Sequence, residues 1–271
     1  MKTGLIRIIS ICVINFVLNY LLLFPLGLFK YIATPDFKMF GIVGIVVSGI
    51  PALATLLFYK LIDRKQFGTL GFKFRRKDVM FSITSITGTI VLMIIVVMIA
   101  SNIGLISAEW NTRAFTEVSF YFSVILVFAT WFIAAFYEEL LFRGYFTANL
   151  GFLPTKKLYL MTSFIFMIFH IFKGLDIFSI LILMVISCVF LYVYLRSGSL
   201  LPGTFAHLIF NFTTSHLVGN SDIALLKYNS DLGVYNLIFI FFYSIITILL
   251  TNVFYRNNVQ SSVEEKGTFH V

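Results

Sequence analysis

Eight long apolar segments divide the chain, and they constrain its fold more than any other feature of the sequence. A transmembrane helix needs about 20 predominantly apolar residues to cross the hydrocarbon core of a bilayer. The sequence therefore predicts an all-α fold, a polytopic membrane helix bundle with about eight transmembrane helices. The segments are Leu5–Leu28, Met39–Ile62, Val79–Ala100, Phe120–Thr147, Leu158–Phe172, Ile177–Leu195, Leu200–Leu217 and Leu232–Tyr255.

The composition supports a membrane protein and excludes other classes. Hydrophobic residues make up 59% of the 271 residues and charged residues only 12%, whereas about a quarter of a soluble domain is charged. A soluble fold could not bury 33 Phe and still present a polar surface. Disordered and disulfide-stapled classes are excluded as well. Cys12 and Cys188 lie inside apolar segments, where we expect small buried hydrophobic residues that neither pair nor bind metal.

The distribution of Lys and Arg predicts the orientation. With the N-terminus inside the cell, fifteen of the 20 basic residues fall in inner segments. Cytoplasmic loops carry such an excess, so we predict that both termini lie inside. The net charge of +8 then reflects topology, and no nucleic-acid partner is expected. The five basic residues in outer segments are Lys30, Lys38, Arg113, Lys173 and Lys227.

Two adjacent glutamates near the end of the fourth segment are its most unusual polar residues. A charged side chain at the centre of a membrane helix costs about 2.5–3.5 kcal/mol. Glu139 and Arg143 are four residues apart on one helix face, with the acid first, which favours an ion pair. Glu138 is rotated about 100° away and is a candidate general base. In the alternative interpretation, these charges merely mark the cytoplasmic end of the helix.

Later segments contain two histidines and an asparagine. His170 lies in the fifth segment, and His207 and Asn211 share a helix face in the seventh. At 1.5 Å per residue, Glu138 and His170 both lie about 18 Å from the cytoplasmic loop, and His207 and Asn211 about 10 and 16 Å. Three helices could therefore bring a carboxylate, two imidazoles and an amide together. Structural hydrogen bonds between helices are the alternative interpretation.

Small and polar residues in the first two segments predict helix packing. Gly44, Ser48 and Ala52 form a stripe of small residues, which favours close approach of a neighbouring helix. Asn15 and Asn19 are a polar pair at the same helical spacing. We expect the pair to form hydrogen bonds between helices.

Three short motifs occur in a fixed order, and together they resemble the CAAX protease and bacteriocin-processing family (CPBP, or Abi) of intramembrane proteases. Leu70–Arg75, before the third segment, is similar to a further feature of that family. The resemblance covers about residues 120–217. The motifs are Glu138-Glu139-x-x-x-Arg143, Phe166-x-x-x-His170 and His207-x-x-x-Asn211.

The resemblance implies a division of the chain and a cellular location. Residues 1–118 would hold the first three transmembrane helices, and residues 119–217 a catalytic core of helices four to seven. Residues 218–271 would hold the last helix and a polar cytoplasmic tail. The family resemblance also implies a multi-pass protein in the plasma membrane of a bacterium; the oligomeric state is left open.

The resemblance further implies an endopeptidase that hydrolyses a peptide bond in a membrane-embedded or lipid-anchored protein. Glu138 would activate water with help from His170, while His207 and Asn211 would stabilise the oxyanion. Family members are often called metalloproteases. The residues are compatible with a metal-free mechanism or with a divalent metal such as zinc, bound by Glu138, His170 and His207.

The same resemblance gives structural roles to three further residues. Glu139 and Arg143 would hold their helix in register, and Phe166 would support the site.

Two other functions compete with proteolysis. A family member could act without hydrolysis, in bacteriocin self-immunity or as a scaffold for envelope proteins. Alternatively, Glu138 and His170 could form the relay of a proton-coupled transporter.

Overall fold

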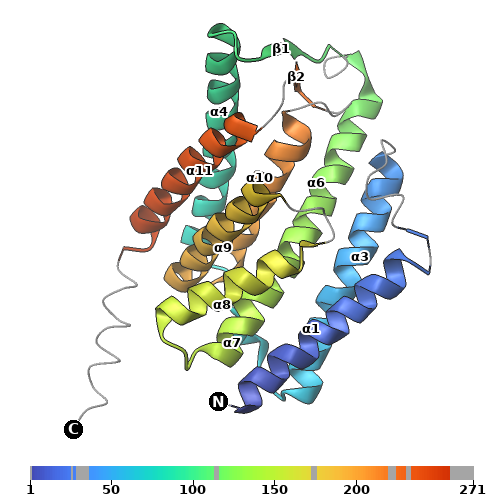
Figure 1. Cartoon of the computed structure of the whole chain (residues 1–271), viewed down its shortest axis with the longest axis vertical. Helices are drawn as coiled ribbons and strands as arrows, with labels where there is room; N and C mark the ends of the chain where they lie inside the picture. The colour runs from blue at the N-terminus through green and yellow to red at the C-terminus, as the bar shows by residue number, and fades with distance from the viewer. Residues whose placement is uncertain are drawn as a thin grey trace.

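The apolar segments form helices that pack into one bundle, shown in Figure 1. This structure is a computed structural model and describes residues 2–25, 27–28, 37–112, 116–171, 176–218, 224–229 and 233–256. Backbone polar groups have no water to bind inside a bilayer, so each apolar segment must satisfy them internally as a helix. The predicted all-α membrane bundle is confirmed, with one small pair of strands added.

Long helices form most of the bundle. They are α1 (Lys2–Leu23), α3 (Phe37–Leu57), α4 (Arg76–Asn102), α6 (Val118–Glu139), α9 (Ile177–Ser197) and α11 (Gly233–Phe254). Shorter helices are α7 (Phe146–Leu150), α8 (Thr155–Ile168) and α10 (Leu200–Phe212). The strands β1 (Ser107–Trp110) and β2 (Leu226–Asn229) pair antiparallel, with Ser107 opposite Asn229.

Three of these helices continue into π-helical turns. The turns η1 (Phe58–Ile62), η3 (Leu140–Tyr145) and η5 (Thr213–Leu217) follow α3, α6 and α10. A short 3₁₀ turn, η2 (Phe67–Leu70), lies in the connection before α4. Single π-helical turns are rare and frequently occur at functional sites. The turn η3 is therefore notable, because it follows directly after the two glutamates.

Six helical stretches among the described residues are long and apolar enough to cross a membrane. Two of the eight predicted transmembrane segments are not among them, because α8 has 14 residues and α10 has 13. At 1.5 Å per residue they extend about 20 Å, less than the roughly 30 Å of a hydrocarbon core. The multi-pass architecture is confirmed. His170 lies just beyond the end of the short helix α8, and His207 lies within the short helix α10.

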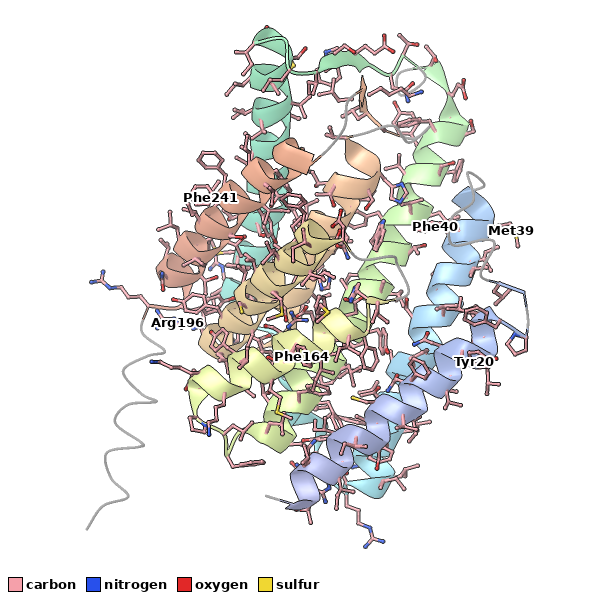
Figure 2. The ribbon with its side chains drawn as sticks, viewed as in Figure 1. Tyr20, Met39, Phe40, Phe164, Arg196 and Phe241 are labelled. Atoms are coloured by element: carbon pink, nitrogen blue, oxygen red, sulfur yellow. The ribbon has the colours of Figure 1, made fainter. Side chains whose placement is uncertain are left out.

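Apolar side chains cover the outer surface of the bundle. Tyr20, Phe164 and Phe241 are each more than half exposed, and Figure 2 shows them on its outer helices. Isolated apolar residues are normal on any protein surface, but large continuous apolar faces mark contact with a partner or a membrane. The exposed residues on α1, α8 and α11 therefore fit lipid contact.

The stripe of small residues in α3 packs against α6, as predicted. A Cβ added at Gly44 would collide with the Thr130 Cγ2 atom. The Thr130 hydroxyl donates a hydrogen bond of 3.2 Å to the Gly41 carbonyl. The predicted polar contact of the first helix is also present, because the Asn15 amide donates to the Thr55 hydroxyl at 3.2 Å. Small and polar residues thus fix α1 and α3 against the rest of the bundle.

Helix α10 lies at the centre of the bundle, in contact with α4, α6 and α9. The Tyr243 hydroxyl on α11 donates to the Ala206 carbonyl at 2.8 Å. At the start of α10, the Leu200 amide donates to the Gly71 carbonyl at 2.9 Å. Gly71 has a φ of 88°, a conformation that favours glycine. The segment Leu70–Arg75 therefore holds the beginning of the central helix.

Helix α9 begins at a capping aspartate that lies outside the transmembrane segment. The Asp176 side chain accepts a hydrogen bond of 2.6 Å from the Ser179 amide. This hydrogen bond lowers the pKa of Asp176, because it stabilises the charged carboxylate. The cap sets the start of the helix whose later turns contact the polar centre of the bundle.

Part of the predicted topology lies outside the described residues. Residues 257–271, which include Lys266 and most of the predicted polar tail, belong to this part. So do Lys30, Arg113 and Lys173 of the predicted outer loops. The orientation with both termini inside therefore stays a prediction.

Candidate active site

The predicted ion pair between Glu139 and Arg143 is present at the junction of α6 and η3. The Arg143 Nη1 atom lies 3.0 Å from the Glu139 Oε1 atom. Glu139 is 1% exposed and Arg143 is fully buried. A charge buried this deeply is tolerated only when it is paired and hydrogen-bonded. The pair therefore belongs to the interior of the bundle and does not mark the surface end of a helix.

Helices α8 and α9 provide the other contacts of the Arg143 guanidinium. Its Nη2 atom donates to the Ser187 carbonyl at 3.2 Å and to the Ser187 hydroxyl at 3.3 Å. Its planar group lies 4.8 Å from the ring centroid of Phe166 and 5.4 Å from that of Phe190. Arginine forms such contacts because its planar cation is weakly hydrated. One buried cation thus joins three helices.

Glu139 also binds His207, a contact that the spacing of the motifs did not predict. The His207 Nδ1 atom lies 2.9 Å from the Glu139 Oε1 atom, so the imidazole N–H donates to the carboxylate. Gly203 permits this approach, because a Cβ there would lie 3.0 Å from the Glu139 Oε2 atom. Glu139 therefore connects α6 to the centre of α10 and fixes the orientation of the His207 ring.

Both imidazoles face the same oxygen of Glu138. The His207 Nε2 atom lies 3.6 Å from the Glu138 Oε2 atom, and the His170 Nε2 atom lies 3.8 Å from it. The Glu138 side chain is 17% exposed, compared with 10% for His170 and 3% for His207. The ends of α6 and α8 and the middle of α10 thus converge on one partly accessible carboxylate.

Hydrogen bonds and ring contacts fix both imidazoles. The His170 Nδ1 atom lies 2.8 Å from the Phe166 carbonyl oxygen, which can only accept, so Nδ1 carries the proton. The Phe166 ring lies 4.6 Å from the His170 ring, and the Phe190 ring stacks on His207 at 4.5 Å and 24°. Each imidazole thus uses Nδ1 for orientation and directs Nε2 at Glu138.

Asn211 lies one helical turn beyond His207 on α10 and is half-buried. Among the residues that the structure describes, its side chain has no hydrogen-bond partner. The predicted shared face of His207 and Asn211 follows from the helix, but the structure does not bring the amide into contact with Glu138 or His170. Any role for Asn211 depends on a bound substrate.

The groups around Glu138 include possible metal ligands. Two Nε2 atoms and a carboxylate have the right chemistry for zinc, and a carboxylate on the far ring nitrogen is common among zinc-bound histidines. Within the described part of the chain, no group of three His, Cys, Asp or Glu side chains is close enough together to hold a metal ion as it stands. A divalent metal bound by Glu138, His170 and His207 therefore stays a prediction.

Two residues of α9 contribute to the site without any signal in the motifs. Ser187 accepts from Arg143, and Phe190 covers both Arg143 and His207. Phe190 is one of 33 phenylalanines, so composition and spacing could not distinguish it. Ser187 is a polar residue inside an apolar segment, and this polarity is the feature of the sequence that could have identified it as part of the site.

The comparison with protein families identifies the central part of the chain. Residues 120–213 match the family model described as type II CAAX prenyl endopeptidase Rce1-like. The matched segment contains all three motifs, from Glu138 to Asn211, and confirms the family resemblance. A search of curated proteins and a search of solved structures each gave no match.

Proposed function

Because residues 120–213 carry the Rce1-like segment of the CAAX protease and bacteriocin-processing family, we propose that the chain is an intramembrane endopeptidase with Glu138 as its general base. The observation that carries this proposal is the convergence of the His170 and His207 Nε2 atoms on the Glu138 carboxylate. A carboxylate with two imidazoles in a largely buried site is suited to proton transfer.

In the proposed reaction, Glu138 takes a proton from a water molecule as the water oxygen attacks the peptide carbonyl carbon. The separations of 3.6 and 3.8 Å between Glu138 and the imidazoles exceed hydrogen-bond length. A water beside the carboxylate could contact Glu138 and one imidazole together. The C–N bond then breaks, and the proton held by Glu138 passes to the leaving amine. The products are a carboxylic acid and an amine.

His170 and His207 take different roles in this proposal. The neutral His170 ring has its proton on Nδ1 and a lone pair on Nε2, so Nε2 accepts a hydrogen bond from the water. His207 donates from Nδ1 to the Glu139 carboxylate, which fixes the orientation of its ring. Together with the Asn211 amide, His207 would stabilise the oxyanion of the tetrahedral intermediate.

Glu139 and Arg143 act as positioning residues. Glu139 orients the His207 ring, and Arg143 compensates the charge of Glu139. The contacts of Arg143 with Phe166 and Phe190 hold α6, α8 and α9 around the site. Preorganised groups of this kind lower the barrier because they need no rearrangement during the reaction.

The expected substrate is a membrane-embedded or lipid-anchored peptide or protein. The site lies between helices whose outer faces are apolar, so the scissile bond must approach from the bilayer or its surface. A CAAX-like protein is the substrate class that the family description supports. Metal dependence is a separate question, which elemental analysis of active protein would answer.

The proposal is tested with Glu138→Gln in the purified protein and a quenched peptide carrying a lipid anchor. General base catalysis contributes about 10²–10⁴-fold, so we expect at least a hundredfold loss of turnover. Glu109→Gln is the matched control, because Glu109 is an exposed acid on β1 and its replacement should leave turnover within twofold. Unchanged turnover in Glu138→Gln would contradict the proposed base.

Complementation of a deletion strain distinguishes proteolysis from the two alternative functions. If the Glu138→Gln variant complements the deletion fully, the chain acts as an immunity factor or scaffold without hydrolysis. Solute flux in proteoliposomes that depends on Glu138 would instead favour proton-coupled transport. Loss of complementation, together with accumulation of an uncleaved membrane peptide, is the result expected of an endopeptidase.

A further inference from the structure

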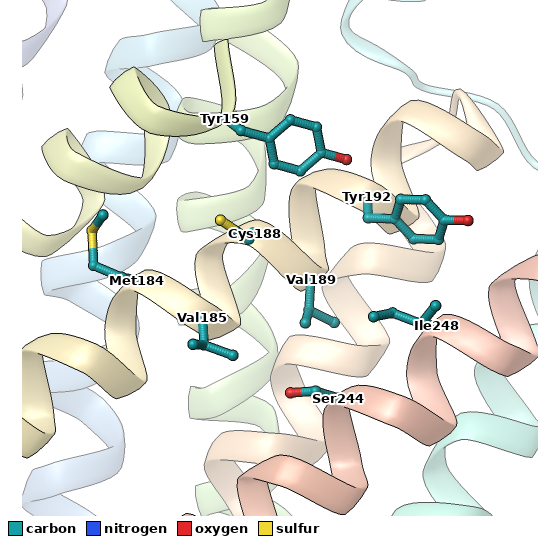
Figure 3. A pocket seen from close by; sticks show the side chains of 8 residues that line it. All are labelled: Tyr159, Met184, Val185, Cys188, Val189, Tyr192, Ser244 and Ile248. Carbon is teal, nitrogen blue, oxygen red and sulfur yellow. The ribbon is translucent and has the colours of Figure 1, made fainter. Parts of the chain in front are cut away.

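A cavity lies on the other side of α9 from the proposed active site. It has a volume of about 540 Å³ and lies between α8, α9 and α11. Its lining includes Tyr159, Val185, Cys188, Tyr192, Ser244 and Ile248, whose side chains surround it in Figure 3. This volume is within the range of small-molecule binding sites. None of the residues described at the Glu138 site lines this cavity.

The cavity wall is almost entirely apolar, and the cavity opens towards the outside of the bundle. Val185, on the wall, is 46% exposed. The Ser163 hydroxyl and the Cys188 sulfur lie 3.3 Å apart and join α8 to α9, so the cavity has a fixed inner wall. In a chain that crosses a bilayer, an apolar opening of this kind faces lipid chains. The apolar wall of the cavity suits an acyl chain.

One end of the cavity is polar. The Tyr192 hydroxyl donates to the Asn252 Oδ1 atom at 2.5 Å, and the Arg196 Nη2 atom donates to the same oxygen at 3.0 Å. The Arg196 guanidinium lies 5.7 Å from the centroid of the Tyr192 ring. Asn252 thus holds a hydroxyl and a cation together where α9 and α11 end. Tyr159 of α8 lines the same cavity as Tyr192.

Two further basic residues lie near this end. Lys156 precedes Tyr159 by about one turn of α8, and Arg256 follows Asn252 by about one turn beyond α11. Both side chains are exposed. An arrangement of cations at the mouth of an apolar groove complements an anionic head group, and basic pockets between transmembrane helices bind such lipids.

We propose that this cavity is a binding site for an anionic phospholipid, with one acyl chain between α8, α9 and α11 and the phosphate beside Arg196. The site is distinct from the proposed active site. Cys188 and Val189 line the cavity, whereas their neighbours Ser187 and Phe190 contact Arg143 and His207. Helix α9 therefore separates a lipid site from a catalytic site.

The test is native mass spectrometry of the full chain in mild detergent with added dioleoylphosphatidylglycerol or dioleoylphosphatidylcholine. We expect one phosphatidylglycerol per chain to be retained in preference to phosphatidylcholine. Val185→Trp fills the cavity and should lower retention of phosphatidylglycerol at least tenfold. Val91→Trp is the matched control, because Val91 is 48% exposed on α4, away from the cavity, and it should change retention by less than twofold.

The head-group interaction is tested with Arg196→Gln. One basic side chain near a charged surface changes lipid affinity about fivefold, so phosphatidylglycerol retention should fall by that factor while phosphatidylcholine retention stays constant. Equal retention of both lipids by the unmodified chain would overturn the proposal, as would full retention in Val185→Trp. If Val185→Trp does not fold, Ser244→Leu narrows the same cavity from α11 and must give the same loss.

Discussion

The peripheral helix α1 and the central helix α10 are both strongly apolar, yet they meet opposite surroundings. In the most apolar window of α1, 17% of the residues are buried. Nine of the thirteen residues of α10 are buried. Apolar residues suit lipid contact and burial equally, so hydropathy does not separate these two environments.

The difference lies in what each helix does with its polar residues. In α1, Asn15 forms one hydrogen bond with Thr55 of its neighbour. In α10, His207 connects to Glu139 and faces Glu138, within a network that includes Arg143. An unsatisfied polar group in an apolar medium is costly. The polar groups at the centre are therefore joined in one network, whereas the contact of Asn15 with Thr55 at the periphery is local.

The comparison of α1 with α10 predicts that the largest loss of stability follows replacement of the buried Arg143. Arg143→Met removes the partner of Glu139 and leaves a buried carboxylate uncompensated, which costs about 3–5 kcal/mol. Equilibrium unfolding in detergent measures this change. Arg76→Met, at an exposed arginine of α4, should change stability by less than about 0.5 kcal/mol. The double variant Glu139→Gln with Arg143→Met should recover part of the loss, and a double variant as unstable as Arg143→Met alone would contradict the pairing.

The next effect concerns the positioning role of Glu139. Glu139→Gln should lower kcat about 10–100-fold, as replacements of orienting partners do, with KM within about twofold. The glutamine oxygen can still accept from His207, so Glu139→Ala should be slower again. Steady-state kinetics on the lipid-anchored peptide separates the two parameters. Equal losses in Gln and Ala variants, or a loss confined to KM, would show that Glu139 does not orient the imidazole.

Packing between the outer and inner helices gives a smaller effect. Gly44→Val introduces a side chain that meets Thr130, and overpacking of this kind costs about 1–3 kcal/mol. Gly49→Val is the matched control on the same helix, because a Cβ there has its nearest neighbour at 3.9 Å. Thermal unfolding of both variants in one detergent provides the measurement. Similar midpoints would mean that α3 does not pack closely on α6 at Gly44.

The smallest effect is expected at the periphery. Asn15→Leu removes the hydrogen bond to Thr55, and side-chain hydrogen bonds between membrane helices average about 0.6 kcal/mol. A double-mutant cycle with Thr55→Val isolates this coupling. A coupling of several kcal/mol would place α1 energetically on a level with the centre and remove the distinction between the two regions.

Much of the fold was predictable because its main signals are local. Apolar segments of sufficient length predict helices in a membrane, and the small-residue stripe at Gly44 predicted close packing against a neighbouring helix, which the structure identifies as α6. The lengths of α8 and α10 were not predictable in the same way. Their apolar sequences continue into the following turns, and the ends of the helices depend on the neighbours that they meet.

The residues of the site could be predicted from the sequence more fully than the contacts between them. Helical spacing alone predicts the ion pair of Glu139 with Arg143. The charge and polarity of Glu138, His170 and His207 made them conspicuous in apolar segments. The contacts of His207 with Glu139 and of Phe190 with Arg143 join helices far apart in sequence, so no local spacing encodes them.

The sequence by itself determined that this protein is a multi-pass helical membrane protein, and its ordered motifs indicated the family whose model residues 120–213 match. Both follow from properties that neighbouring residues share: apolarity over about twenty positions, and polar residues at helical spacing. Helical spacing already assigned Glu139 to Arg143 and left Glu138 as the candidate base, but only the tertiary structure showed that Glu138 faces both imidazoles and that Glu139 binds His207. Glu138 and Glu139 are chemically identical neighbours, and their roles differ because the packing of α6 and η3 among α8, α9 and α10 gives each carboxylate different partners.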